Sequence, residues 1–180
     1  MRKIYLYLPL LFFFILVIFF ARQLILDKDP SKLPSVLLDK SFPSVKLNQL
    51  DSYKLFNKEN LLFIGEPSLV NIWSSWCAPC QIEHEFLMKM SDEHNIKIFG
   101  INYKDDKTDA INVLKLNGNP FYAIGRDEDG TQAINLGVYG VPETFIIDAS
   151  GKIRYKHVGP ILEYDMNDII LPILNKIKRE

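Results

Sequence analysis

The sequence predicts an α/β fold, in which a mixed central sheet is flanked by helices and lies behind one N-terminal transmembrane helix. Three observations support this prediction. The chain opens with a long uncharged apolar run, strand-like and helix-like segments alternate from Ser68 onward, and a hairpin-like turn joins two late strands. Alternating strands and helices are typical of a layered fold with a parallel sheet, to which the hairpin adds antiparallel strands.

The N-terminal segment has the composition of a membrane anchor. Residues 4–21 read IYLYLPLLFFFILVIFFA, an 18-residue run without a charge. As a helix it would extend about 27 Å, close to the hydrocarbon thickness of a bilayer. A cleaved signal peptide is the alternative, but FFARQ lacks a small-residue cleavage site and the run exceeds a usual signal core. We therefore expect an anchor over residues 1–26 and a linker over 27–35. Basic residues flank the run on both sides, so charge alone leaves its orientation open.

The remaining residues, 36–180, are expected to form one domain. Residues 36–60 predict short strands and turns. SLVNIWS (68–74) is a short apolar and β-branched run that predicts a strand. A helix follows over 77–92, because apolar residues recur there at helical spacing: Ile82, Phe86, Leu87 and Met90.

The rest of the domain continues the alternation. NIKIFGINY (95–103) predicts a second strand, and residues 106–116 predict a helix that stops at Asn117-Gly118. PFYAIG predicts a third strand. ETFIID and KIRYKHVG predict two more around the turn 149–151. The chain closes with an amphipathic helix in which Pro172 predicts an irregularity.

The chain has two cysteines, Cys77 and Cys80, in the stretch SSWCAPCQ. A structural zinc site needs four ligands, and the three histidines show no paired spacing. A purely structural disulfide is the other alternative, but closing so short a loop would stabilise the fold only weakly. A redox pair fits better, because Cys77 would lie at a helix N-terminus, where backbone N–H groups and the helix dipole favour a thiolate. Pro79 suits the first helical turn.

Four stretches carry a resemblance to a known family. WCAPC after an apolar strand resembles the thioredoxin superfamily. WCAPCQIEHEFL, INYKDD, GNPF and LGVYGVPETFIID, in this order behind an anchor, resemble the membrane-anchored cytochrome c maturation reductases of the CcmG/DsbE type. The resemblance covers residues 68–159, with weaker likeness over 36–50. It implies a thioredoxin-like fold, a cis Val141–Pro142 bond facing the dithiol, and a domain in the periplasm, anchored in the bacterial inner membrane.

The resemblance also implies an activity and partners. The protein would be a thiol-disulfide reductase that keeps the CxxCH cysteines of apocytochrome c reduced for haem attachment. Cys77 would be the nucleophile and Cys80 the resolving thiol. A transmembrane electron donor of the DsbD/CcdA type would reduce the protein, and the cytochrome c maturation complex is a further candidate partner. The residues expected to shape the site are Trp76, Pro79, Val141, Pro142 and Glu143.

The proton acceptor of this site is an open question in the sequence. Many thioredoxins carry a buried Asp six residues before the first cysteine, where this chain has Asn71. Glu143 and Glu83 are candidate substitutes, with Glu85 a third. A carboxylate near a thiol opposes thiolate formation, which suits a reductant. The alternative is that Glu83 and Glu85 are solvated helix residues. His84 is expected to face the surface or a partner.

Charge and composition limit the possible partners and cofactors. The formal net charge is −1, so we expect no nucleic-acid partner. No metal is expected, and no cofactor other than the redox-active cysteine pair. Three functions remain as alternatives: a general reductase of the TlpA/ResA kind with other extracytoplasmic substrates, an oxidase that introduces disulfides, and a chaperone that holds apocytochrome without catalysis.

Overall fold

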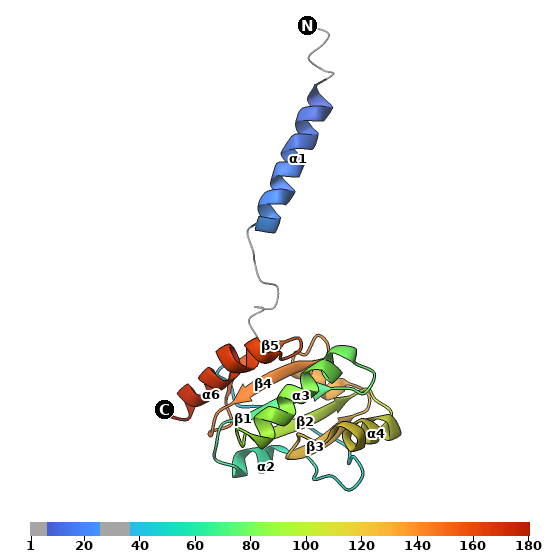
Figure 1. Ribbon diagram of the computed structural model, residues 1–180, viewed down its shortest axis with the longest axis vertical. Helices are drawn as coiled ribbons and strands as arrows, with labels where there is room; N and C mark the ends of the chain where they lie inside the picture. The colour runs from blue at the N-terminus through green and yellow to red at the C-terminus, as the bar shows by residue number, and fades with distance from the viewer. Residues whose placement is uncertain (1–6, 26–36) are drawn as a thin grey trace. The chain divides into compact units, whose positions relative to one another are not determined.

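The computed structural model of the protein describes residues 7–25 and 37–180, in two units that are considered separately, Met1–Leu33 and Pro34–Glu180. The first unit contains helix α1 (Leu8–Ile25), shown in Figure 1. Its described side chains are exposed. Within the two described ranges, no helix is both long and apolar enough to cross a bilayer. Part of the expected anchor and the whole expected linker, 27–35, lie outside the described residues.

The second unit is built on a five-stranded sheet in the order β3-β2-β1-β4-β5. The first three strands pair in parallel, while β4 is antiparallel to both β1 and β5. The mixed sheet with a parallel portion and a late antiparallel hairpin is therefore confirmed. The strands are β1 (Ser68–Trp73), β2 (Ile98–Tyr103), β3 (Ala123–Asp127), β4 (Glu143–Ile147) and β5 (Ile153–Val158).

Helices cover both faces of this sheet. Helices α3 (Ala78–Asp92) and α4 (Lys107–Asn117) connect parallel strands that advance in one direction, so right-handed crossovers place both on the same face. The C-terminal helix α6 (Leu171–Ile177) shares their hydrophobic core, and Figure 1 shows α3 between α6 and α4. The opposite face is covered by α2 (Lys58–Phe63) and α5 (Thr131–Asn135). These two helices were not predicted, because each is too short to show a clear period.

The segment before β1 protects the edge of the sheet. Instead of the short strands expected over 36–60, it makes isolated bridges, two of them to edge strand β3. Asn48 exchanges two backbone hydrogen bonds with Arg126, and Ile124 N–H donates to Lys54 O at 2.8 Å. An exposed edge strand invites pairing with other chains, so this segment closes the β3 side of the sheet.

The C-terminal helix begins with a widened turn. The segment η2 (Asp165–Ile170) has π-helical geometry, and Leu171 N–H donates to Met166 O, five residues back. Pro172 follows directly. It has no N–H for the carbonyl four residues before it, and its ring would clash with that carbonyl in an ordinary α-helix. The irregularity predicted at Pro172 is therefore confirmed, and the wider turn accommodates it.

A large-to-small substitution tests whether the segment before β1 belongs to the core. Phe56 is 1% exposed, and its ring centroid lies 4.9 Å from that of Phe99 on β2. We expect Phe56→Ala to lower the free energy of unfolding by about 3–5 kcal/mol, because it leaves a cavity. Phe63→Ala is the control, since Phe63 is 88% exposed. Urea denaturation followed by circular dichroism measures both, and equal losses would contradict the expectation.

Candidate active site

The candidate site lies at the edge of the sheet where β1 and β2 end and β4 begins. Trp73, the last residue of β1, pairs with Asn102 near the end of parallel β2, and Ile72 pairs with Glu143, the first residue of β4. The segments after β1, after β2 and before β4 therefore meet at one edge. Carboxyl ends of parallel strands are a common location for sites in α/β folds.

Cys77 and Cys80 form a disulfide at this edge, with an S–S distance of 2.06 Å. Cys77 is the N-cap residue of α3, and Pro79 lies in the first turn of the helix. The N–H of Cys80 donates to Cys77 Sγ at 3.1 Å. The placement of Cys77 at the start of a helix is confirmed. Both cysteines are buried in the disulfide form.

The inward face of α3 does not follow the apolar residues alone. Ile82, one of the four apolar residues at helical spacing, is 56% exposed. Glu83, one residue later, is fully buried and lies one helical turn after Cys80 on the same face. The other three, Phe86, Leu87 and Met90, are buried. The alternative of a solvated Glu83 is therefore wrong, and a carboxyl group occupies a core position beneath the disulfide-bearing turn.

The Glu83 carboxyl is held by neutral donors. Asn71 Nδ2 donates to Glu83 Oε1 at 2.9 Å, and the N–H of Ile161 donates to Oε2 at 3.1 Å. Asn71 Nδ2 also lies 3.0 Å from Thr144 Oγ1. Burial raises the pKa of Glu83 from 4.5 to about 7, and the hydrogen bonds from Ile161 and Asn71 only partly oppose this shift. Asn71, six residues before Cys77, is thus a hydrogen-bond partner of a buried carboxyl group on α3.

Glu143 and the cis-proline lie on the other side of the same edge. The Val141–Pro142 peptide bond is cis, as the resemblance implied. Glu143 is buried, and its Oε2 lies 2.8 Å from Lys156 Nζ, while its Oε1 accepts the N–H of Tyr139 at 2.8 Å. Its carboxylate is thus engaged with a lysine and a loop, and these contacts do not bring it to the cysteines.

Sequence reasoning missed the role of Asp105. Its carboxylate accepts the backbone N–H and the hydroxyl of Ser75, each at 2.6 Å, and Asn102 Nδ2 at 2.7 Å. The preceding carbonyl, of Lys104, accepts the indole N–H of Trp76 at 3.0 Å. Asp105 therefore fixes the segment that leads into Cys77. The available signal was INYKDD, which places an acid just beyond a strand parallel to β1.

The two tryptophans have different environments. Trp73 is buried and stacks on Phe121, with centroids 5.5 Å apart. Gly100 allows this packing, because a Cβ there would lie 2.9 Å from Phe121 Cδ1. Trp76, directly before Cys77 in the chain, is 58% exposed.

Two other polar residues of α3 differ in exposure. His84 was expected to face the surface or a partner, but it is buried in this chain, and its Nε2 lies 3.1 Å from Gly118 O. The reason is that α4 ends against this part of α3. Glu85 is exposed.

Among the residues described, no group of three or more His, Cys, Asp or Glu side chains is placed to hold a metal ion.

Solved structures share this architecture. The putative thiol:disulfide interchange protein DsbE from Chlorobium tepidum superposes with a TM-score of 0.65 and 24% identity, over 78% of this chain and 99% of that one. A thiol-disulfide oxidoreductase from Bacteroides fragilis gives a TM-score of 0.61 and 21% identity, over 75% of this chain and 99% of that one. At these identities the similarity establishes the fold, which is thioredoxin-like, as expected.

Sequence comparisons extend the similarity to a family. Residues 38–170 match the family described as Redoxin. The thiol:disulfide interchange protein DsbE of Vibrio cholerae is 40% identical over 100% of this chain and 98% of its own length. The DsbE proteins of Pseudomonas fluorescens and Escherichia coli are 43% and 41% identical, over 93% and 84% of this chain and 92% and 82% of their own lengths. The chain therefore belongs to the redoxin family and, within it, to the DsbE thiol:disulfide interchange proteins, which are thiol-disulfide oxidoreductases.

Proposed function

We propose that the protein is a membrane-anchored periplasmic thiol-disulfide reductase that keeps the CxxCH cysteines of apocytochrome c reduced for haem attachment. The observation that carries the reductase part is a buried carboxyl, Glu83, one turn below a cysteine pair at a helix start. The cytochrome substrate, the periplasmic location and a DsbD/CcdA-type electron donor rest on the resemblance of the sequence to this class of reductase.

Cys77 is the proposed nucleophile. In the reduced protein its thiolate attacks the substrate disulfide, forms a mixed disulfide and releases one substrate thiolate, which takes a proton from water. The Cys80 N–H, 3.1 Å from Cys77 Sγ, and the N-terminus of α3 stabilise negative charge on this sulfur. Cys80 then attacks Cys77 Sγ, the second substrate thiolate leaves, and two electrons have passed to the substrate.

Glu83 is the proposed proton acceptor for Cys80. With a pKa of about 7 its carboxyl group can take up and release a proton near neutral pH. The amide of Asn71 can serve both protonation states of Glu83. Its Nδ2 donates to the carboxylate, and its Oδ1, which is buried without a hydrogen-bond partner, can accept from the protonated acid after rotation of the amide. The ionised form of Glu83 opposes a nearby thiolate. A less stabilised reduced form makes a dithiol a weaker oxidant, as a reductant requires.

The remaining site residues have proposed roles in shaping the site. Trp76 flanks the disulfide, Pro79 supports the first turn of α3, and Val141 and Pro142 form the wall that a substrate backbone would meet.

The membrane anchor over residues 1–26, the linker over 27–35 and the domain over 36–180 are part of the proposal. The uncharged apolar run 4–21 supports the anchor. An anchor would confine the dithiol to the surface on which cytochromes are assembled. The cytochrome c maturation complex would be a partner there.

Deletion of the protein tests the cytochrome role. We expect c-type cytochromes to disappear from haem-stained gels, because the CxxCH site stays oxidised, and an added external thiol reductant to restore them. Complementation with a Cys77→Ser, Cys80→Ser variant should fail. Normal haem staining in the deletion strain would contradict the role and favour a general TlpA/ResA-like reductase, while rescue by the double variant would favour a chaperone.

A trapping experiment tests the assignment of the two thiols. We expect Cys80→Ser to accumulate a mixed disulfide with a peptide that carries an oxidised CxxCH, because the resolving step is lost. Cys77→Ser should not form it. Mass spectrometry after acid quenching measures both, and the reverse pattern would contradict the assignment.

Glu83→Gln tests the proton acceptor. Because the pKa of Glu83 is raised in the folded protein, the folded state binds more protons than the unfolded one between pH 4.5 and about 7. The stability of the oxidised wild type should therefore fall as pH rises through this window, by roughly 3 kcal/mol. Denaturation at several pH values should show this fall absent in Glu83→Gln. The resolving step should also lose its rise near pH 7 in stopped-flow measurements.

The control for that experiment is Glu85→Gln, which changes the same residue type at an exposed position on the same helix. It should retain both pH dependences. If Glu83→Gln retained them as well, another group would be the proton acceptor.

A further inference from the structure

The loop of residues 137–140 precedes the cis peptide bond and depends on one carboxylate. Its first half turns back onto α5 through two backbone hydrogen bonds. In its second half, the N–H groups of Tyr139 and Gly140 both donate to Glu143 Oε1, at 2.8 and 3.3 Å. The path of the loop next to the disulfide is therefore set by the position of the Glu143 side chain.

Lys156 on β5 holds that side chain in place. Its Nζ lies 2.8 Å from Glu143 Oε2 and donates to Gly137 O at 2.7 Å. Phe145 is opposite Lys156 in the β4–β5 pairing, so Glu143, two residues earlier, is a diagonal neighbour on the same face. One buried ammonium thus connects the start of the loop with the carboxylate that holds its end.

Stability alone does not account for this ion pair. The Lys156 and Glu143 side chains are 4% and 1% exposed, so both charges are removed from water. Buried ion pairs often stabilise a fold no more than apolar residues of the same volume would. What the pair does here is geometric, since it connects three points of one loop.

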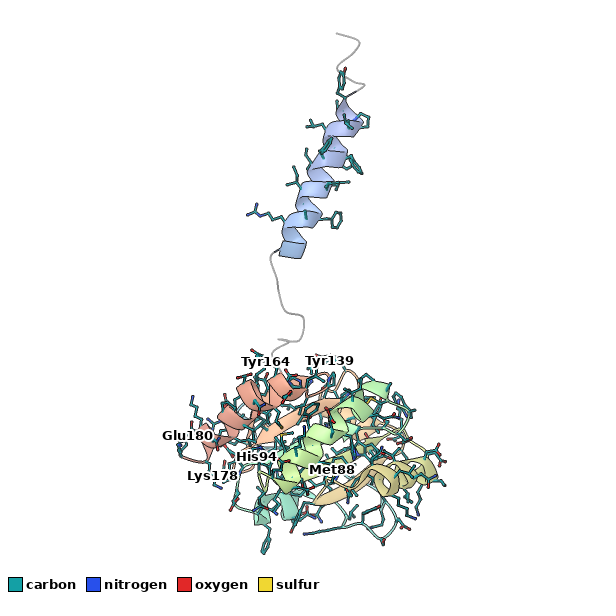
Figure 2. The ribbon with its side chains drawn as sticks, viewed as in Figure 1. Met88, His94, Tyr139, Tyr164, Lys178 and Glu180 are labelled. Atoms are coloured by element: carbon teal, nitrogen blue, oxygen red, sulfur yellow. A yellow bond between two sulfur atoms is a disulfide. The ribbon has the colours of Figure 1, made fainter. Side chains whose placement is uncertain are left out.

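The loop presents an aromatic side chain at the edge that bears the disulfide. Tyr139 is 76% exposed, and its ring centroid lies 4.8 Å from Lys156 Nζ, within the range of a cation–π contact. Trp76 and Tyr164 are also largely exposed. Figure 2 shows Tyr139 and Tyr164 at the same edge of the domain in this view. Tyrosine and tryptophan are enriched at protein interfaces, because each combines a large apolar ring with a polar group.

We propose that Lys156 is a positioning residue for polypeptide disulfides. Through Glu143 and Gly137 it fixes the loop so that Tyr139 contacts a disulfide-bonded polypeptide while its disulfide meets Cys77. On this proposal, a small disulfide such as glutathione disulfide makes no contact with Tyr139, and its rate does not depend on the loop. The inference rests on the proposed reductase activity, and concerns which disulfides that activity favours.

Lys156→Met tests the proposal, because methionine fills a similar space without the charge. Stopped-flow rates of the reduced protein are measured with an oxidised CxxCH peptide, with an unrelated disulfide-bonded polypeptide, and with glutathione disulfide. We expect the ratio of the polypeptide rates to the glutathione disulfide rate to fall by on the order of tenfold or more, because the loop is misplaced. Lys152→Met, at an exposed position before β5, should leave the ratio unchanged.

A double-mutant cycle separates positioning from a structural effect. Tyr139→Ala should lower the same ratio. The double variant Tyr139→Ala, Lys156→Met should lower it no further than Tyr139→Ala alone, because both changes remove the same contact between Tyr139 and the polypeptide. Lys156→Met leaves the buried Glu143 carboxylate without its cation and could prevent folding. In that case the double variant Glu143→Gln, Lys156→Met, which has no unpaired buried charge, is measured in the same way.

The outcomes are distinct from those of the proposed function. An unchanged ratio in a folded Lys156 variant, or additive effects in the cycle, would overturn the positioning role. A wild type that reduces none of the three disulfides would instead remove the proposed reductase activity. A wild type that prefers polypeptides but not the CxxCH peptide would remove only the cytochrome substrate, and the Lys156 effect would still be expected with both polypeptides.

Discussion

Strand β1 is the constraint on which the rest of the domain depends. All six of its residues are buried, and both of its edges are hydrogen-bonded, to β2 on one side and to β4 on the other. A parallel neighbour ends where β1 ends, and an antiparallel neighbour begins there. The cysteine segment, the loop that carries Asp105 and the cis-proline loop therefore share one edge as a consequence of strand pairing.

Two buried carboxyl groups near that edge show how partners decide what an acid can do. Glu83 is held by an amide and a backbone N–H, which carry no charge, so burial favours its protonated form and raises its pKa to about 7. Glu143 is paired with Lys156, which balances its charge. A group with a pKa near neutral can exchange a proton, whereas a group in a buried ion pair is suited to holding a loop in place.

Much of the site could be predicted because its signals are local. A strand followed by WCAPC indicates a helix that starts at the cysteines, and GVYGVPETF places a proline before the next strand. The environment of the acidic residues could not be predicted in the same way. From the sequence, Glu83 could be a proton acceptor or a solvated helix residue. The structure buries Glu83, and Asn71 and Ile161 supply hydrogen bonds to its carboxyl group.

By itself, the sequence determined the order of the five strands and the longer helices, the pairing of the two cysteines, and the irregularity at Pro172, because each depends on residues within one turn or strand of one another. Only the tertiary structure decided which carboxyl is buried with neutral partners and which is paired with a lysine. The backbone N–H that holds Glu83 is 78 residues away in the chain. Burial and pairing of a charge depend on such distant contacts, which no local pattern of residues encodes.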